Sequence, residues 1–318
     1  MPTATSQVVG QLQHAIARII YGKEEAIQLA LITLLARGHL LIEDVPGVGK
    51  TTLAQALAKS FQCSFQRIQF TSDMLPSDVL GVSVYNPESR VFEFRSGPIF
   101  ANVVLADEIN RTTPRTQSAL LEAMNEAQVT VDGKTLPLPR PFLVIATQNP
   151  VEHHGTYPLP ESQLDRFLMR IKMGYPSHET EREIMRRRTG PAGDDPLSTL
   201  RPVADIQEVM AMQESVALVK VDASLLDYAL EIVNRTRNSE QLALGVSPRG
   251  TLMLQRAAQA RAFLEGRDYC LPDDFKHLAV AVFSHRVVAS ARHASLQKKS
   301  ETTESVLRDI VDSVRVPV

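Results

Sequence analysis

The chain reads LLIEDVPGVGKTTLAQAL from residue 40 to residue 57, an apolar run joined to a helical pattern by a glycine-rich turn. Gly49, Lys50 and Thr51 match the end of the phosphate-binding pattern G-x-x-x-x-G-K-[ST], and Gly47 helps the turn. Consecutive backbone N–H groups and a helix N-terminus form a cradle for anions in such a loop. Lys50 can then reach the β- and γ-phosphates of a nucleotide, and the Thr51 hydroxyl can ligate Mg²⁺. We therefore expect ATP and Mg²⁺ to bind at Val45, Pro46, Gly47, Val48, Gly49, Lys50, Thr51 and Thr52.

One residue of this loop departs from the pattern. Asp44 stands where the pattern has its first glycine. A carboxylate at that position adds negative charge close to the phosphates, unless its side chain points away from them. The motif therefore predicts that the Asp44 side chain is turned out of the site.

Four further apolar runs follow the loop and alternate with helical stretches. They are FQRIQF at 65–70, NVVLADE at 102–108, FLVIAT at 142–147 and FLMRI at 167–171, and two helices precede the loop within residues 7–38. Continuous apolar runs are typical of strands covered on both faces, as in a parallel sheet wound with helices. The predicted fold class is α/β, a three-layer αβα core of the P-loop NTPase type with a parallel sheet. Alternating patterns around Asn86-Pro87 and Asp132-Gly133 predict two inserted β-hairpins, at 82–94 and 128–138.

Two acids end the third apolar run. Asp107 and Glu108 follow VVLA some fifty-five residues after the phosphate loop. A carboxylate at the end of the strand can hold the Mg²⁺ shell, which makes Asp107 a second metal ligand with Thr51. Its neighbour Glu108, on the other side of the strand, can polarise a water molecule for attack on the γ-phosphate. Asn149, at the end of FLVIATQNP, can orient that water without adding charge, although a simple turn asparagine is the alternative.

Two arginines complete the candidate catalytic set. Arg166 lies in QLDRF, just before the last predicted strand, where it can sense phosphate or simply pair with Asp165. Arg249 lies in Ser247-Pro248-Arg249 at the head of a helix, from which it can reach back toward the nucleotide.

Length and composition set the remaining limits. The 318 residues suffice for two domains, and 34 basic against 36 acidic residues disfavour a surface devoted to nucleic acid or anionic lipid. Two distant cysteines, short apolar runs and the lack of a signal peptide predict a protein without a membrane segment in the cytoplasm. A segment rich in Pro, Gly and Asp at 190–202 predicts a linker between a core at 1–189 and a helical lid at 203–318. Beyond this linker the pattern is helical to the end.

These motifs together resemble those of the MoxR family of AAA+ ATPases. EDVPGVGKTT is similar to the family's Walker A segment, residues 103–124 to its Walker B segment, ATQNP to sensor 1, residues 155–167 to the stretch ending in the arginine finger, and GVSPRG to sensor 2. The resemblance implies that Arg166 acts on a neighbouring subunit and that Arg249 acts within its own. It also implies that an acid at Asp44 is ordinary, and that the hairpins are the helix-2 insert and the pre-sensor hairpin. The implied partners are copies of the chain in a hexameric ring and a client protein. The client carries a von Willebrand factor A-like domain or needs a metal or cofactor inserted.

Three other functions share parts of this pattern. A nucleic-acid motor has the same core and hairpins, but the hairpin tips carry one charge of each sign, with Asp132 beside Lys134 and Glu88 near Arg90, which disfavours DNA. A magnesium-chelatase-like subunit also shares the core. A switch that binds nucleotide without hydrolysis is disfavoured because Glu108, Asn149 and Arg166 are all present. A metal site at His153-His154 is disfavoured because adjacent side chains point apart.

Overall fold

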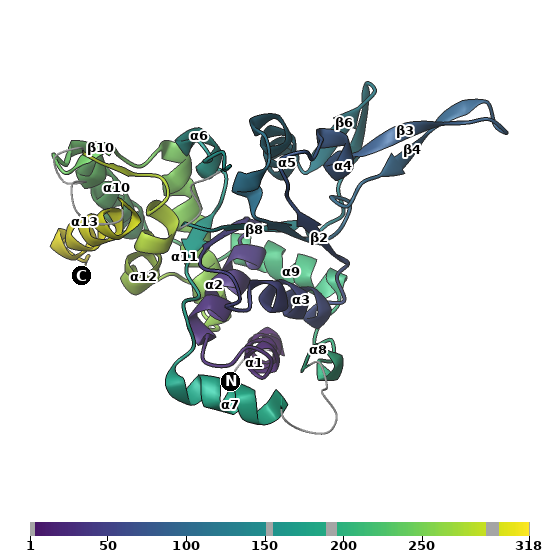
Figure 1. Ribbon diagram of the computed structural model, residues 1–318. Coiled ribbons are helices and arrows are strands. Elements are labelled where there is room, and N and C mark those ends of the chain that lie inside the picture. The colour runs from purple at the N-terminus through teal and green to yellow at the C-terminus, as the bar shows by residue number, and fades with distance from the viewer. Residues whose placement is uncertain (1–3, 151–154, 189–195, 291–298, 318) are drawn as a thin grey trace.

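The computed structural model describes residues 4–150, 155–188, 196–290 and 299–317 and places a five-stranded parallel sheet at the centre of the molecule (Figure 1). The strand order is β2-β5-β8-β1-β9. The strands are β1 (Leu40–Glu43), β2 (Phe65–Gln69), β5 (Val103–Asp107), β8 (Leu143–Gln148) and β9 (Met169–Ile171). All four pairings are parallel. The predicted α/β core is therefore confirmed.

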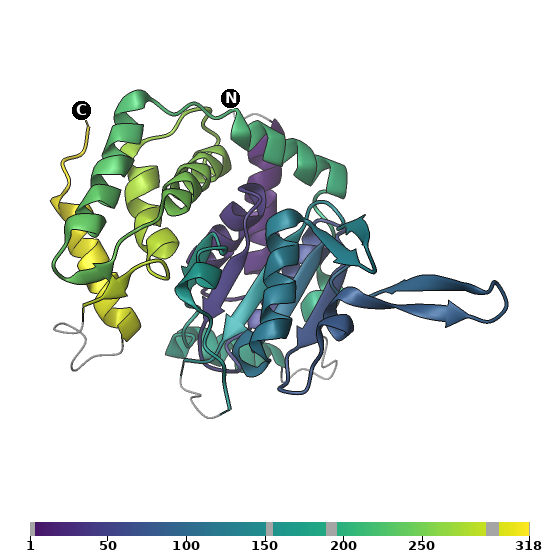
Figure 2. The same ribbon diagram turned by 90° about the horizontal axis from the view of Figure 1, so that it is seen from above.

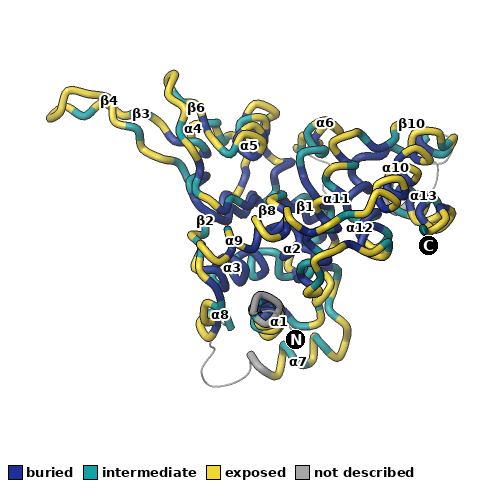
Figure 3. The backbone as a smooth tube through the Cα atoms, turned by 180° about the vertical axis from the view of Figure 1, so that it is seen from behind, coloured by how far each residue is buried: buried dark blue, intermediate teal, exposed yellow. Residues whose placement is uncertain are grey.

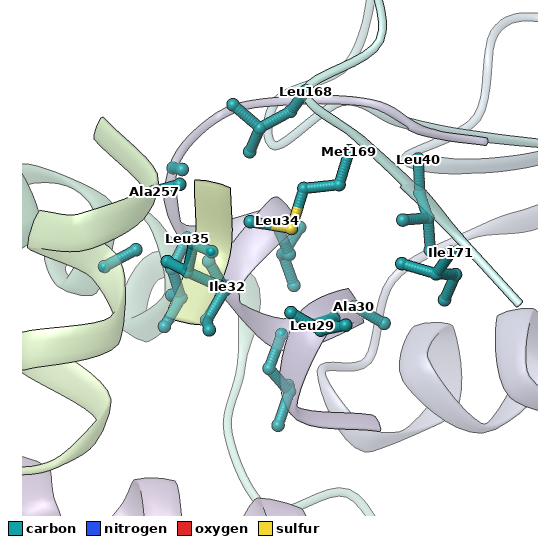
Figure 4. Packing of buried hydrophobic residues seen from close by; sticks show 14 of the residues in the cluster. Leu29, Ala30, Ile32, Leu34, Leu35, Leu40, Leu168, Met169, Ile171 and Ala257 are labelled. Carbon is teal, nitrogen blue, oxygen red and sulfur yellow. The ribbon is translucent and has the colours of Figure 1, made fainter. Parts of the chain in front are cut away.

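Alternate residues of each strand enter two different apolar clusters, which is why the strands read as continuous apolar runs. Leu40, Ile42 and Leu105 face one cluster, whereas Leu41 and Val104 face the other. The first cluster packs against α1 (Ala4–Ala17), α2 (Glu24–Leu35) and α3 (Lys50–Ser60), and the second against α5 (Pro114–Glu126). Figure 4 shows side chains of α2 packed between the sheet and the lid residue Ala257. This arrangement makes three layers.

Two hairpins extend from this core, as their alternating sequences predict. One is formed by β3 (Gly81–Asn86) and β4 (Val91–Ser96) after the short helix α4 (Pro76–Leu80), and it projects far beyond the body (Figure 2). The other is formed by β6 (Gln128–Val131) and β7 (Lys134–Pro137). Asp132 and Gly133 both have positive φ, as a two-residue hairpin turn requires.

The C-terminal part is helical with one exception. It contains α9 (Ile206–Ala217), α10 (Ala223–Asn238), α11 (Pro248–Leu264), α12 (Pro272–Phe283) and α13 (Lys299–Ser313). The expectation of helices to the end of the chain was wrong at β10 (Leu242–Leu244) and β11 (Val288–Ala289), which pair antiparallel. Runs of two and three residues are too short to produce a period of two, so only the contact between them forms the pair.

The connection between the two parts is only partly described. α7 (His178–Arg188) precedes it, residues 189–195 lie outside the described ranges, and α8 (Pro196–Thr199) lies within the predicted linker. Beyond it, the side chain of Gln213 on α9 donates to the Leu34 carbonyl of α2 at 2.7 Å, so α9 packs against the core. Figure 3 shows the buried sheet and the exposed hairpins from behind. In the described part of the chain, no helix is long and apolar enough to cross a membrane.

Candidate functional site

The phosphate loop connects β1 to α3 in a conformation that depends on its glycines. Gly47 and Gly49 have φ of 85° and 95°, a region that other residues rarely adopt. Gly49 is the residue before α3, so the unpaired N–H groups of the first helical turn follow it directly. These N–H groups and the positive end of the helix dipole favour an anion at this point.

A cavity of about 350 Å³ opens in front of this loop, at the carboxyl ends of the strands, where open α/β sheets bind their ligands. It is lined by Pro46, Gly47, Gly49, Lys50, Thr51, Thr52, Arg67, Gln69, Asp107, Glu108, Thr147 and Asn149. The structure thus brings together the predicted phosphate loop, the acid pair and the amide, which lie up to a hundred residues apart in the chain.

The two predicted loop residues outside this lining have another environment. Val48 is buried in the apolar core, and Val45 packs against the same cluster. Their side chains therefore fix the loop to the core. Only their backbone groups can serve a phosphate.

Thr147 links the two acids at the end of β5. Its hydroxyl donates to Asp107 Oδ1 at 2.6 Å and accepts from the backbone N–H of Glu108 at 2.9 Å. The parallel register pairs Ala106 with Ala146, which places Thr147 beside Asp107 on the neighbouring strand. Sequence reasoning missed Thr147, although its place two residues before Asn149 marks it as part of the same strand end.

Glu108 has a backbone conformation that is unusual for its type. Its φ and ψ are 57° and 48°, in the left-handed region, and it precedes the 3₁₀ turn η1 (Ile109–Arg111). Such conformations cost roughly 1–3 kcal/mol and cluster at functional sites, where the surrounding structure enforces them. Here Ile109 and Asn110 are buried behind the turn, so the packing holds Glu108 at the cavity.

Two residues of the edge strand β2 reach the same acids, and sequence reasoning missed both. Arg67 donates from Nη2 to Asp107 Oδ2 at 2.6 Å, and Gln69 donates from Nε2 to Glu108 Oε2 at 2.8 Å. The register pairs Gln69 with Asp107, so β2 delivers these side chains across the sheet. Alternation of residues in FQRIQF is the only local signal, and by itself it does not indicate a site.

Lys50 lies among charges of opposite sign. Its ammonium donates to the Asp44 carbonyl at 2.8 Å. Burial lowers the pKa of Lys50, while Asp107, Asp44 and Glu108 act to raise it. A lysine in this position offers its N–H groups to a phosphate that enters the cavity.

Asp44 is turned out of the cavity, as the sequence analysis requires. Its Oδ1 accepts from the Val45 N–H at 2.8 Å, and its Oδ2 accepts from the N–H groups of Met173 and Gly174 at 2.6 and 2.5 Å. The carboxylate thus ties the phosphate loop to the chain that leaves β9.

The two predicted arginines lie apart from the described residues of the cavity lining. Arg166 is half-buried and donates from Nη1 to the Leu121 carbonyl of α5 at 2.5 Å, so it is not the simple partner of Asp165. Arg249 is exposed in the first turn of α11. Both positions differ from that of Lys50, and neither arginine reaches the site of its own chain here.

The site has the ligand chemistry that Mg²⁺ prefers. Thr51 and Asp107 supply hard oxygen atoms, and Mg²⁺ commonly uses one or two such protein ligands together with phosphates and water. Within the described residues, no group of three or more His, Cys, Asp or Glu forms a metal cage. His153 and His154, which we set aside as a metal site, lie outside the described ranges.

Comparison with known proteins agrees with this geometry. Residues 39–169 match the model of the ATPase family associated with various cellular activities (AAA), and residues 234–310 match that of the AAA lid domain. The chain is 50% identical to the YeaC protein of Bacillus subtilis over 98% of its own length and 95% of that protein. It is 44% identical to Chaperone MoxR1 of Mycobacterium tuberculosis over 86% of its length and 74% of that protein.

A solved structure of an assigned ATPase from Cytophaga hutchinsonii has the same fold. It superposes with a TM-score of 0.89 at 36% identity, over 99% of this chain and 96% of the other. The phosphate loop, the acid pair at the end of β5 and the helical lid all fall within these matched segments. The chain belongs to the MoxR family of AAA+ ATPases.

Proposed function

We propose that the protein hydrolyses Mg-ATP at the cavity and uses the energy to remodel a client protein. The observation that carries this proposal is the convergence of Lys50, Thr51, Asp107, Glu108 and Asn149 on one cavity. Each of these residues has a distinct task in phosphoryl transfer, and the cavity brings all of them to the end of the helix that binds the phosphates.

The tasks follow from the position of each group. The N–H groups of Gly47 to Thr52 and the Lys50 ammonium hold the phosphates. Thr51 and Asp107 would hold Mg²⁺, which neutralises charge on the phosphate oxygens when it is bound. Glu108 accepts a proton from the attacking water, and Asn149 orients that water.

We assign Arg166 and Arg249 to opposite sides of a subunit interface. Arg249, on the lid, would reach the nucleotide of its own chain when the lid closes. Arg166 would stabilise charge on the γ-phosphate bound by a neighbouring subunit. Support comes from the position of Arg166 outside the cavity of its own chain, and the arrangement suits a homo-oligomer, which we expect to be a hexameric ring.

The client assignment rests on the family and on the projecting hairpin. The relative called Chaperone MoxR1 suggests a chaperone role, and we propose a client with a von Willebrand factor A-like domain in the cytoplasm. Tyr85 and Phe92 on the β3–β4 hairpin are exposed and in contact edge to face, with ring centroids 5.4 Å apart. Exposed aromatic rings suit contact with a protein surface.

The nucleic-acid motor is the second candidate. The β6–β7 tip carries Asp132 and Lys134, and the β3–β4 tip carries Glu88 and Arg90. These balanced charges lack the basic stripe that phosphate contacts need. A magnesium-chelatase-like role shares the core and is separated from ours only by the client.

The substitution Glu108→Gln tests the proposed reaction. We expect ATP to bind with unchanged affinity, while hydrolysis falls by about 10²–10⁴-fold because the general base is lost. Glu122→Gln is the matched control, since Glu122 is exposed on α5. Phosphate release measures turnover, and calorimetry measures binding.

Three results would count against the proposal. Near-normal turnover in Glu108→Gln would mean that the water is activated elsewhere. Stimulation by single-stranded DNA would favour the motor. A purified von Willebrand factor A-like client that leaves turnover unchanged would contradict the client assignment.

A further inference from the structure

The turn that carries Arg166 is fastened to the lid of its own chain. Arg286, which follows α12, donates from Nε to Asp165 Oδ1 at 2.8 Å. The same guanidinium donates to the carbonyl groups of Asp165 and Leu168, at 3.3 and 3.2 Å, and to that of Phe167. Carbonyl groups on both sides of Arg166 are therefore held by one side chain from the lid.

Burial makes this contact strong and specific. The side chain of Arg286 is only 1% exposed, and that of Asp165 is 21% exposed. A buried guanidinium needs a charged partner, because an uncompensated buried charge is costly. Burial also lowers the pKa of Arg286, whereas Asp165 acts to raise it. The planar fork of the guanidinium fixes orientation as well as distance.

A second lid contact reaches the same carboxylate. Ser247 donates from its hydroxyl to Asp165 Oδ2 at 3.0 Å and accepts from the Gly250 N–H at 3.1 Å, which caps α11. Gly250 also packs on Arg286, because a Cβ there would lie 2.8 Å from Arg286 Cδ. Arg249 follows Ser247 by two residues. The helix head that carries Arg249 is thus bound to the turn that carries Arg166.

We propose that Asp165 is a positioning residue that joins the lid to Arg166, so that the lid orientation set by Arg249 on one nucleotide controls how Arg166 meets the next subunit's nucleotide. This inference rests on the proposed trans role of Arg166. Asp165 touches neither nucleotide, and it acts through Ser247 and Arg286.

The arrangement has a clear mechanical consequence. The Arg166 guanidinium touches the core at Leu121, whereas the backbone on both sides of Arg166 is held by the lid. A lid rotation therefore moves the backbone of Arg166 relative to α5. Displacement of a catalytic group by about 1 Å can cost 10²-fold in rate.

Mixed rings test the inference in one direction across the interface. Arg166→Ala subunits keep an intact site, and Lys50→Ala subunits supply an intact Arg166, so their mixture should recover turnover. We then place Asp165→Asn in the Lys50→Ala subunit, whose own site is already inactive. Rescue should fall about 10-fold or more with the KM for ATP unchanged. Asp222→Asn in the same subunit is the control, because Asp222 caps α10 and is exposed.

A milder substitution covers the case in which Asp165→Asn fails to fold. Ser247→Ala in the Lys50→Ala subunit removes one contact to Asp165 and should also lower rescue. Ser215→Ala is its control, since the Ser215 hydroxyl is exposed and bonds only within α9 among the described contacts. Native mass spectrometry of tagged subunits establishes that mixed rings form.

The outcomes separate the two claims. If the mixture of Arg166→Ala and Lys50→Ala stays inactive in mixed rings, the trans role of Arg166 is wrong, and the inference falls with it. If that mixture is active, and both Asp165→Asn and Ser247→Ala rescue as well as their controls, only the positioning role is wrong. A loss that appears equally in both controls would identify a general loss of lid stability and would also overturn the inference.

Discussion

Replacing Asp44 by glycine restores the usual first glycine of the phosphate-binding pattern, yet we expect the change to destabilise the protein. Asp44 is 8% exposed, and its carboxylate accepts from three backbone N–H groups, those of Val45, Met173 and Gly174. Glycine removes all three acceptors, and no neighbouring group described here replaces them.

The size of the effect follows from these three bonds. Hydrogen bonds to a charged group contribute about 1.5–3 kcal/mol each, but bonds that share one acceptor group do not add fully. The N–H groups of Val45 and Gly174 are half-buried and can recover water, whereas Met173 is buried. We therefore expect a loss of about 3–5 kcal/mol in the free energy of unfolding. At about 2–3 °C per kcal/mol, the Tm falls by roughly 6–12 °C.

Thermal unfolding followed by circular dichroism measures this loss, with Asp132→Gly as the matched control. Asp132 is exposed in a hairpin turn at positive φ, where glycine is favoured, so its replacement should leave the Tm unchanged or slightly raised. Asp44→Gly should also weaken ATP binding in calorimetry, because the loop loses its tie to the end of β9. A Tm within 2 °C of the wild type would refute the reasoning about these bonds.

Three further changes test other parts of the molecule. Lys50→Ala should remove a charge-assisted phosphate contact worth about 1.5–3 kcal/mol, so calorimetry showing unchanged ATP affinity would contradict the site. Arg67→Gln should lower by a few fold the Mg²⁺ concentration that half-saturates ADP binding, because the exposed cation paired with Asp107 is lost; an increase would mean that Arg67 contacts the nucleotide instead. Burial lowers the pKa of His39 from 6.5 to about 4, so its neutral form stabilises the fold above pH 6.5. This contribution falls by about 2 kcal/mol between pH 8 and pH 5, and denaturant titrations should show that His39→Gln reduces the pH dependence.

Sequence reasoning succeeds where the relevant chemistry is contiguous. The phosphate loop lies within ten residues, so its glycines, Lys50 and Thr51 are readable as one unit. Continuous apolar runs predict strands buried on both faces, and the sheet has this form. Both hairpins are predictable for the same reason, since each is a local alternation around a turn.

Residues from other strands could not be assigned in this way. Arg67, Gln69 and Thr147 belong to the site only because the strand order β2-β5-β8 places them beside Asp107 and Glu108. Nothing in the local sequence around Arg67 distinguishes it from an ordinary edge-strand arginine. The short β10–β11 pair escaped prediction because its two runs are too brief to have a period.

The contrast between Asp44 and Asp165 shows what each level determines about this protein. The sequence by itself determined that a nucleotide site with a P-loop and an acid pair exists, because those groups are fixed by short stretches of backbone. Only the tertiary structure decided that Asp44 holds the end of β9 and that Asp165 is gripped by Arg286, a residue 121 positions away. The physical reason is that a buried charge is stabilised by whatever the fold brings within about 3 Å of it, and sequence spacing does not encode that distance.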